Sequence, residues 1–451
     1  NGVITPKSVQ LVAGTSQKTY DGTISVAATA ADLATLTAQL GVAGDTVDAV
    51  TLQYSNRNAG FGKALTPSAA VISDGQNGGN YQITYASSHT SVISPKDVTL
   101  TPQTASKTYD ASTFYNANAA DLAYLSAQLG VSGDTVTGIS LVTPDKTIGI
   151  KTLSASSALI NDGNNGLNYA LSYDTSTIAI AAKTISTLNT TVNSKTYDKN
   201  TAATLTGGVL NGVEIGDSVT LTQTGLFATN QAGSNIAVTA IESISGADAG
   251  NYLLSPTLGL TGTITPRTLS VTYGGINKVY DTSTLAQVTT SDNRISGDNL
   301  IINRDASFAS ANVGSNLNIQ LSGVYLSGGD AGNYSVSATG STTSSITQRP
   351  VFVNGSTVNT KVYDGNTNAT LSNGFVVGFL GTDTATLNQV GSFATKNVGS
   401  NIAVTAQETL TGASAGNYII EQPIGLTGII TPKTLTVSGS TVTDRIYDGT
   451  T

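Results

Sequence analysis

A tyrosine–aspartate pair returns at nearly constant intervals along this chain of 451 residues. Each pair follows a Lys or Arg by two residues, and the six are Tyr20-Asp21, Tyr109-Asp110, Tyr197-Asp198, Tyr280-Asp281, Tyr363-Asp364 and Tyr447-Asp448. Their tyrosines are separated by 89, 88, 83, 83 and 84 residues. This interval exceeds the roughly 20 to 50 residues of a solenoid repeat and fits one small domain. The sequence therefore predicts a tandem array of similar domains.

Two further motifs divide the array into units. An asparagine that precedes a tyrosine recurs at Asn80, Asn168, Asn251, Asn333 and Asn417. An Ile-Thr-Pro-Lys segment or a variant of it, such as Ile264 to Arg267, closes the units. The predicted units are 7–95, 96–182, 183–266, 267–348 and 349–432, with 1–6 as the end of a preceding repeat and 433–451 as the start of a sixth. We therefore expect this chain to be an excerpt of a longer array.

Apolar residues alternate inside each unit, and a period of two is typical of half-buried strands. In the fifth unit this pattern predicts strands near 351–358, 368–377, 384–394, 400–410, 417–421 and 425–431. Six or seven short strands per unit favour an all-β fold, an antiparallel immunoglobulin-like sandwich, with a β-grasp domain as the alternative. Because the units are joined by a few residues around a proline, we expect them to stand end to end with limited bending.

The first two units each contain an additional segment, at 30–41 and 119–130. Leu33, Leu36 and Leu40 share one face at helical spacing, and Gly41 occupies the position that usually ends a helix. We predict a short helix in each segment. A helix that crosses a single sheet is a feature of the β-grasp alternative.

Composition excludes several classes of function. Charged residues make up 11% of the chain, the net charge is −8, and no stretch clusters Lys and Arg as nucleic-acid binding requires. The sequence contains no run of about 18 apolar residues, so it predicts no membrane-spanning helix. Cysteine is absent, so thiol catalysis and thiolate metal sites are excluded. The one histidine, His89, lies outside every recurring motif, and we expect no enzyme.

The recurring aspartate of the Tyr-Asp pair is interpreted as a turn residue. Its carboxylate is expected to accept hydrogen bonds from backbone amides two residues on, while the tyrosine ring packs inward with its hydroxyl near the rim. The alternative is calcium, for which Asp74 to Gly78 and Asp162 to Gly166 resemble oxygen-rich loops, although carboxylates are sparse. We therefore assign no metal or cofactor site from the sequence.

An intramolecular isopeptide bond is a further hypothesis. One Lys, one Asp and one Asn recur at fixed spacing, from Lys18, Asp21 and Asn80 to Lys361, Asp364 and Asn417. Such a bond requires a buried lysine amine held against an asparagine amide beside a carboxyl group. Arg445 replaces the lysine in the sixth copy, which argues against it.

The set of motifs resembles the YDG and MBG-type repeats of very large bacterial surface proteins. The motifs are Lys361 to Gly365, Gly216 to Val219, Phe227 through Gly233 to Ile236, Gly329 to Tyr334, and Ile430 to Lys433. The resemblance covers nearly the whole chain and is weakest in the first two units. It implies stalks of filamentous-haemagglutinin-like adhesins, exported by two-partner secretion to the bacterial surface and used in attachment and biofilm formation.

The resemblance leaves three hypotheses for function. The first is a non-catalytic extracellular stalk that projects a binding region from the cell. The second is an array that itself binds extracellular polysaccharide or a host surface, and the third is a filament assembled from sister fibres. Repeated exposed aromatic residues would favour direct binding, whereas exposed strand edges would favour lateral assembly.

Overall fold

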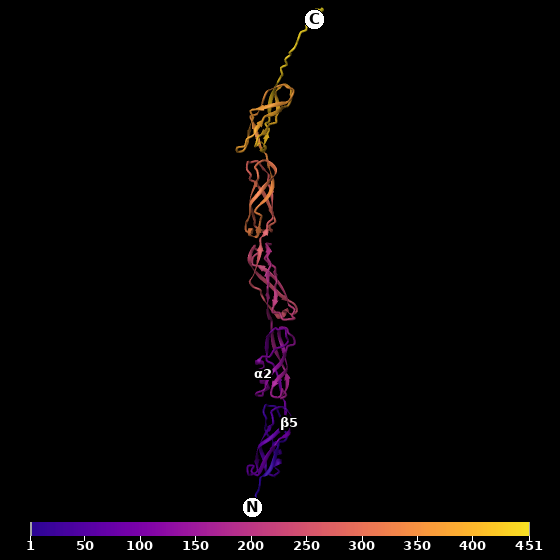
Figure 1. Cartoon of the computed structure of the whole chain (residues 1–451), viewed down its shortest axis with the longest axis vertical. Coiled ribbons are helices and arrows are strands. Elements are labelled where there is room, and N and C mark those ends of the chain that lie inside the picture. Colours follow the sequence, from indigo (N-terminus) through magenta and orange to yellow (C-terminus); the bar gives the residue numbers. More distant parts are fainter. Residues whose placement is uncertain (1, 451) are drawn as a thin grey trace. The chain divides into compact units, whose positions relative to one another are not determined.

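The computed structural model describes residues 2–450, so the first residue of segment 1–6 and the last of segment 433–451 lie outside the described residues. By their contacts the residues form two compact units, one made of Asn1–Val192, Thr204–Gly225 and Thr239–Leu260, the other of Asn193–Ala203, Leu226–Val238 and Thr261–Thr451. Strands dominate both units, as Figure 1 shows. The predicted all-β class is confirmed.

The first two repeats share one order of elements, except that the second has no counterpart of β3. In the first repeat these are β1 (Lys7–Val12), β2 (Gln17–Thr19), β3 (Ser25–Val26), α1 (Ala30–Leu40), β4 (Thr46–Tyr54), β5 (Gly60–Ser73), β6 (Tyr81–Ala86) and β7 (Ser88–Ser94). In the second they are β8 (Lys96–Leu100), β9 (Ala105–Thr108), α2 (Ala119–Leu129), β10 (Thr135–Val142), β11 (Gly149–Asn161), β12 (Tyr169–Tyr173) and β13 (Thr175–Ala181).

The next two repeats have no α-helix among the described residues, and in each a 3-10 turn directly precedes the strand that begins with the tyrosine of the Asn-Tyr motif. The third contains β14 (Lys183–Leu188), β15 (Thr191–Val192), β16 (Lys195–Thr196), β17 (Ala202–Ala203), β18 (Leu205–Thr206), β19 (Val209–Asn211), β20 (Thr220–Phe227), β21 (Gly233–Ser245), η1 (Ala249–Asn251), β22 (Tyr252–Ser255) and β23 (Leu260–Thr265). The fourth contains β24 (Arg267–Thr268), β25 (Val271–Gly275), β26 (Lys278–Val279), β27 (Val288–Asp292), β28 (Ile301–Phe308), β29 (Gly314–Ser327), η2 (Ala331–Asn333), β30 (Tyr334–Ser335) and β31 (Gly340–Thr347).

The fifth repeat follows the predicted strand pattern with more interruptions. It contains β32 (Arg349–Asn354), β33 (Thr357–Val358), β34 (Lys361–Val362), β35 (Asn368–Ser372), β36 (Phe375–Val377), β37 (Thr386–Asn388), β38 (Val390–Phe393), β39 (Gly399–Ala406), β40 (Thr409–Thr411), η3 (Ala415–Asn417), β41 (Tyr418–Glu421) and β42 (Leu426–Thr431). Gly355, with a positive φ of 81°, separates β32 from β33, where one continuous strand was predicted.

The two helices lie where the sequence predicted them. Thr29 caps α1 in a reciprocal capping box with Asp32, and Gly41 ends it in the left-handed conformation with φ of 62°. Leu36 and Leu40 are buried among side chains of β1, β4 and β6. The helix therefore closes one side of the core of its own repeat.

Strand pairing corrects the expectation of an antiparallel sandwich. The strands β3, β4, β5 and β7 of the first repeat pair antiparallel, but β1 pairs in parallel with β6 and β2 in parallel with β7. The second, third, fourth and fifth repeats repeat both parallel pairings. The physical reason is that the chain enters a repeat at one end and leaves at the other, so its first and last strands run in the same direction.

Two sheets enclose the core of the first repeat. Val9 and Tyr81 from the β1–β6 pair pack with Val47 and Ile72 from the larger sheet. This sandwich-like arrangement differs from the β-grasp alternative, in which one sheet is crossed by a helix. The described part of the third to fifth repeats contains no α-helix.

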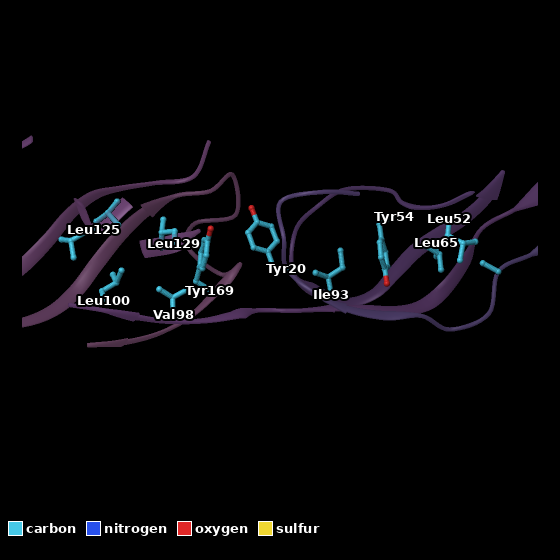
Figure 2. Close-up of a cluster of buried hydrophobic side chains, with 12 residues drawn as sticks. Tyr20, Leu52, Tyr54, Leu65, Ile93, Val98, Leu100, Leu125, Leu129 and Tyr169 are labelled. Atoms are coloured by element: carbon cyan, nitrogen blue, oxygen red, sulfur yellow. The ribbon is translucent and has the colours of Figure 1, made fainter. Parts of the chain in front are cut away.

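A second hydrophobic cluster combines the cores of the first two repeats. It joins Leu52, Tyr54, Leu65 and Ile93 of the first repeat to residues of the second, which are Val98, Leu100, Leu125, Leu129, Val136 and Tyr169. Figure 2 shows Tyr20 between these two groups, with its ring close to that of Tyr169. The tyrosine of the first recurring motif thus lies where one repeat meets the next. In residues 2–450 no helix is long and apolar enough to span a membrane.

Candidate functional site at the junctions between repeats

The aspartate of each Tyr-Asp pair forms a local turn. Asp21 Oδ1 accepts a 2.9 Å hydrogen bond from the backbone amide of Thr23, two residues on. The same bond recurs from Asp110 to Ser112, Asp198 to Asn200, Asp281 to Ser283 and Asp364 to Asn366. The turn holds the preceding tyrosine at the end of the folded repeat that meets the next repeat.

The lysine of this motif lies inside the turn. The Nζ of Lys18 donates to Asp21 Oδ1 at 2.7 Å and to the carbonyl oxygens of Thr23 and Ser25 at 2.7 and 2.9 Å. Its side chain is only 10% exposed. Lys107, Lys278 and Lys361 make equivalent bonds to a carboxylate and two carbonyl groups. An ammonium group thus occupies an oxygen cage of the kind that a metal cation would require.

The tyrosine hydroxyl reaches the next repeat. Tyr20 donates a 2.6 Å hydrogen bond to Asp134 Oδ2, and Tyr169 donates to the same oxygen at 2.8 Å. The two rings meet edge to face, with centroids 5.4 Å apart. Tyr20 and Asp134 are 2% and 4% exposed. The expectation of a hydroxyl at the rim of its own domain is therefore corrected, because the neighbouring repeat covers it.

The same group of three residues recurs at the other junctions. Two tyrosines, one from each repeat, surround an aspartate of the later repeat: Tyr109, Tyr252 and Asp217; Tyr197, Tyr334 and Asp298; Tyr280, Tyr418 and Asp383. The ring centroids are 5.3, 5.5 and 5.4 Å apart, all in edge contact. We call each group of two tyrosines and one aspartate a junction triad.

Burial and hydrogen bonding shift the pKa values of the triad in opposite directions. Burial and the nearby carboxylate of Asp298 raise the pKa of Tyr197 to about 12. Burial and the hydrogen bond to Asp383 raise the pKa of Tyr280 to about 12. Burial alone would raise the pKa of Asp217, but hydrogen bonds from Lys146, Tyr109 and Tyr252 outweigh it and lower that pKa below its usual value. The triads are thus built to hold a carboxylate ion and neutral tyrosines.

A cation from the earlier repeat neutralises three of the four carboxylates. Arg57 reaches Asp134 Oδ1 at 2.8 Å, Lys146 reaches Asp217 at 2.5 Å, and Lys199 reaches Asp298 at 2.8 Å. Within residues 2–450, Asp383 has no such cation and instead accepts a hydrogen bond from Ser414 at 3.2 Å. Arg57 and Lys146 each lie 37 residues after the tyrosine of their Tyr-Asp pair, whereas Lys199 follows Tyr197 by two, so no single motif marks all three cations.

The recurring asparagine connects the backbones across each junction. Asn168 Oδ1 accepts a 2.7 Å hydrogen bond from the amide of Ala59 in the preceding repeat. The equivalent bonds run to Asn251 from Ile148, to Asn333 from Ala232 and to Asn417 from Val313. Asn168 is 0% exposed, whereas Asn80, the equivalent residue of the first repeat, is exposed. The asparagine therefore acts between repeats as well as within them.

From the sequence, only Asp217 of the junction aspartates was noted, within the motif Gly216 to Val219, and no role was assigned to it. Each lies 35 or 36 residues before the tyrosine of the Asn-Tyr motif in its own repeat. Each follows glycine directly or by one residue, as in Gly133-Asp134 and Gly381-Thr382-Asp383. Their fixed spacing could have marked them as a fourth recurring motif.

In the two loops considered for calcium, the aspartate carboxylate accepts hydrogen bonds from backbone amides of its own loop. Asp74 Oδ1 accepts amide hydrogen bonds from Gln76 and Gly78, and its Oδ2 accepts one from Asn80. Asp162 makes the same three bonds with Asn164, Gly166 and Asn168. In residues 2–450, no group of three or more His, Cys, Asp or Glu side chains is placed to hold a metal ion.

The residues proposed for an isopeptide bond are not brought together. Lys18 is bonded within its turn, whereas Asn80 Nδ2 donates to the carbonyl oxygen of Asp74. In the fifth repeat, Lys361 contacts Asn366 and Asn368, whereas Asn417 Nδ2 donates to Asn312 of the preceding repeat. The lysine and aspartate recur because they form a turn, and the asparagine recurs because it makes separate hydrogen bonds elsewhere.

The fold and its junctions define a protein made of small β-domains in tandem, linked by recurring polar and aromatic contacts. A family model described as the YDG domain matches residues 5–89, 181–259, 265–343 and 347–425, which is well over half of the chain. This chain belongs to the YDG domain family. Apart from its last two residues, the second repeat, 96–182, lies outside the matched ranges, although it has both a Tyr-Asp turn and a junction triad.

Comparisons with other proteins add little. No match to a curated protein was found. Among solved structures, Drosophila N-cadherin EC1-4 aligns with 75% of this chain and 100% of its own, at 6% identity and a TM-score of 0.16. No argument about fold or function rests on so weak a likeness.

Proposed function

We propose that this chain is a non-catalytic stalk segment of an extracellular bacterial adhesin, which projects a binding region from the cell surface for attachment or biofilm formation. Its membership in the YDG domain family and its tandem repeats support the proposal. The resemblance of its motifs to repeats of large surface proteins points in the same direction.

The junction triad is the observation on which the proposal chiefly depends. A stalk must resist bending where one repeat meets the next, and a junction resists bending when its contacts are buried and directional. The triad supplies two short hydrogen bonds to one carboxylate, as from Tyr109 and Tyr252 to Asp217, both at 2.6 Å. Charge-assisted bonds of this kind are shorter and stronger than neutral ones.

The buried carboxylates and paired tyrosines that recur along the chain lie at these junctions. The side chain of Asp217 is 1% exposed and is held by Lys146 as well as by both tyrosines. The recurring tyrosines that could have offered aromatic surfaces to a sugar are buried against each other. A stalk would use the buried triads to hold neighbouring repeats in place. Direct binding of polysaccharide would give the triads no part in binding.

The test displays the chain on a cell between a membrane anchor and a reporter domain that binds beads. Removing whole repeats should reduce capture of the beads in steps when surface polysaccharide shields the cell. The chain without a reporter should not retain polysaccharide in a pull-down. Capture that is independent of repeat number would contradict the stalk, and retention of polysaccharide by the bare chain would favour direct binding.

A further inference from the structure

The first and the last segment of each repeat lie side by side and run in the same direction. In the first repeat, β1 pairs in parallel with β6, from Lys7 opposite Tyr81 to Val12 opposite Ala86. The chain then continues from β1 into β2 and from β6 into β7, and β2 pairs in parallel with β7. The two strands that enter the repeat are therefore held by the two strands that leave it.

This arrangement determines how tension along the chain loads a repeat. The chain enters the first repeat at the start of β1 and leaves it at the end of β7. In parallel segments these two points lie at opposite ends, so tension slides the segments past each other. The hydrogen bonds between them then carry the load together, among them Tyr20 N to Ser94 O at 2.9 Å. In antiparallel segments the two points would lie at the same end, and the bonds would open one at a time.

Buried side chains resist the same sliding movement. Val9 and Leu11 of β1 are 8% and 0% exposed, and both belong to the core cluster that contains Tyr81 of β6. Sliding β1 along its axis would pull these two side chains out of their places in the core. Because protein cores are close-packed, such a movement breaks many contacts at once. Packing and hydrogen bonding therefore resist tension at the same place.

The parallel contacts differ in length between repeats. Among the described residues, the contact made by the first entering strand spans six residue pairs in the first repeat, five in the second, four in the third, two in the fourth and four in the fifth. The second contact spans three, four, two, two and two pairs in chain order. In the fourth repeat β24 ends at Thr268 and β30 ends at Ser335, which makes its contacts the shortest.

We propose that the two parallel contacts of each repeat form a mechanical clamp that bears tension along the chain, and that the fourth repeat yields first. Its clamp has the fewest bonds to share the load. A stalk carries tension between the cell and a bound target, so this role rests on the proposed function. Unfolding of residues 267–348 releases about 82 residues, which span roughly 270 to 300 Å when extended, and the added length relieves the tension on the other repeats.

Pulling the first repeat of the full chain in two directions tests the clamp. Handles at Ser8→Cys and Ser94→Cys load the clamp along its strands, because these exposed residues lie near the start of β1 and at the end of β7. Handles at Ser8→Cys and Gln82→Cys, which are exposed partners in register, instead peel β1 from β6 from one end. The chain contains no cysteine, so the handles attach only at these positions. At one pulling speed, the peeling pair should open the repeat at a force several times lower.

A disulfide in the fourth repeat tests which repeat yields first. Ser307 on β28 and Gln320 on β29 are exposed cross-strand partners, outside the strands of both clamp contacts. In a chain with Ser307→Cys and Gln320→Cys that is held by its two ends, the disulfide keeps about 13 residues from extending. The unfolding event of the fourth repeat should then be shorter by about 45 Å than in the same chain after reduction. This shortened event should be the one of lowest force.

Two outcomes would overturn the proposal. The first is an equal force for the two pairs of handles, which would show that the parallel contacts do not act as a clamp. The second is a shortened event that follows the unfolding of other repeats. Neither measurement uses adhesion as its readout, so a failure of the clamp is distinguished from a failure of the stalk in the bead-capture test.

Discussion

The hydroxyl of Tyr20 donates a 2.6 Å hydrogen bond to Asp134, 114 residues further along the chain and in the next repeat. Tyr169 donates to the same carboxylate oxygen from within that repeat. One aspartate thus accepts a hydrogen bond from each of the two repeats that meet at the junction. The arrangement recurs at four junctions, and it explains why the tyrosine motif and the asparagine–tyrosine motif recur together.

Replacing Tyr20 by phenylalanine tests the strength of this bond. The ring contact with Tyr169 should survive, but Asp134 should lose one of its two hydroxyl donors. Hydrogen bonds to charged groups contribute about 1.5 to 3 kcal/mol, so Tyr20→Phe should destabilise the junction by a free energy of this order. Urea unfolding followed by tyrosine fluorescence measures the loss. Tyr325→Phe, at a 60% exposed site, is the matched control and should change little.

Replacing Lys146 by methionine tests the neutralising cation. The variant keeps the aliphatic stem but leaves Asp217 with tyrosine donors only. Because Lys146 is 35% exposed, solvent screens part of the attraction, and the variant should lower the unfolding midpoint by less than removal of a fully buried charge would. The matched control is Lys396→Met, at an exposed position of the fifth repeat. Equal unfolding midpoints for the two variants would show that Lys146 does not stabilise the junction.

The turn lysine should respond to substitution in a graded way. Lys107→Met removes an ammonium group from three oxygen partners, so nearby amides should exchange hydrogen faster, in keeping with a loss of about 1 to 2 kcal/mol. Lys107→Arg should recover most of the protection, because Arg445 contacts Asp448 and the carbonyl oxygen of Thr450 at 2.7 Å in the sixth copy. Loss of protection by the arginine variant equal to that of methionine would contradict this account of the turn.

Alkaline pH should weaken the third and fourth junctions. The pKa values of Tyr197 and Tyr280 are raised to about 12 in the folded chain, against about 10 when unfolded. The unfolded state therefore loses these protons first, so the stabilisation is complete below about pH 10 and is lost as pH rises toward 12. Ultraviolet titration of tyrosinate should show these two ionising later than the exposed tyrosines. Removing one by Tyr280→Phe should eliminate one late ionisation.

Much of the fold could be predicted from the sequence, because local signals determine it. Alternation of apolar residues located the strands of the fifth repeat, and the leucines with Gly41 located α1. The turn at Asp21 follows from the short reach of an aspartate side chain to amides two residues on. Each of these features depends on residues close in the chain.

The pairing of strands and the partner of each tyrosine could not be predicted in this way. Identical motifs recur in every repeat, so the sequence alone does not say whether Tyr109 meets an aspartate of its own repeat or Asp217 of the next. The parallel pairing of β2 with β7 likewise depends on where the chain enters and leaves the repeat, which alternation does not encode. The cations come from two positions: Arg57 and Lys146 lie 37 residues after a Tyr-Asp tyrosine, but Lys199 lies only two after one, so no single pattern marks them.

The most direct test of the junction triad is a distance distribution between spin labels on adjacent repeats. Labels at Gln53→Cys on β4 and Thr152→Cys on β11 lie at exposed strand positions on either side of the first junction, and the chain has no other cysteine. Pulsed electron spin resonance should give one narrow distribution, and Asp134→Ala should broaden it. A broad distribution in the unaltered pair, or one that Asp134→Ala leaves unchanged, would contradict the claim that the triad fixes neighbouring repeats.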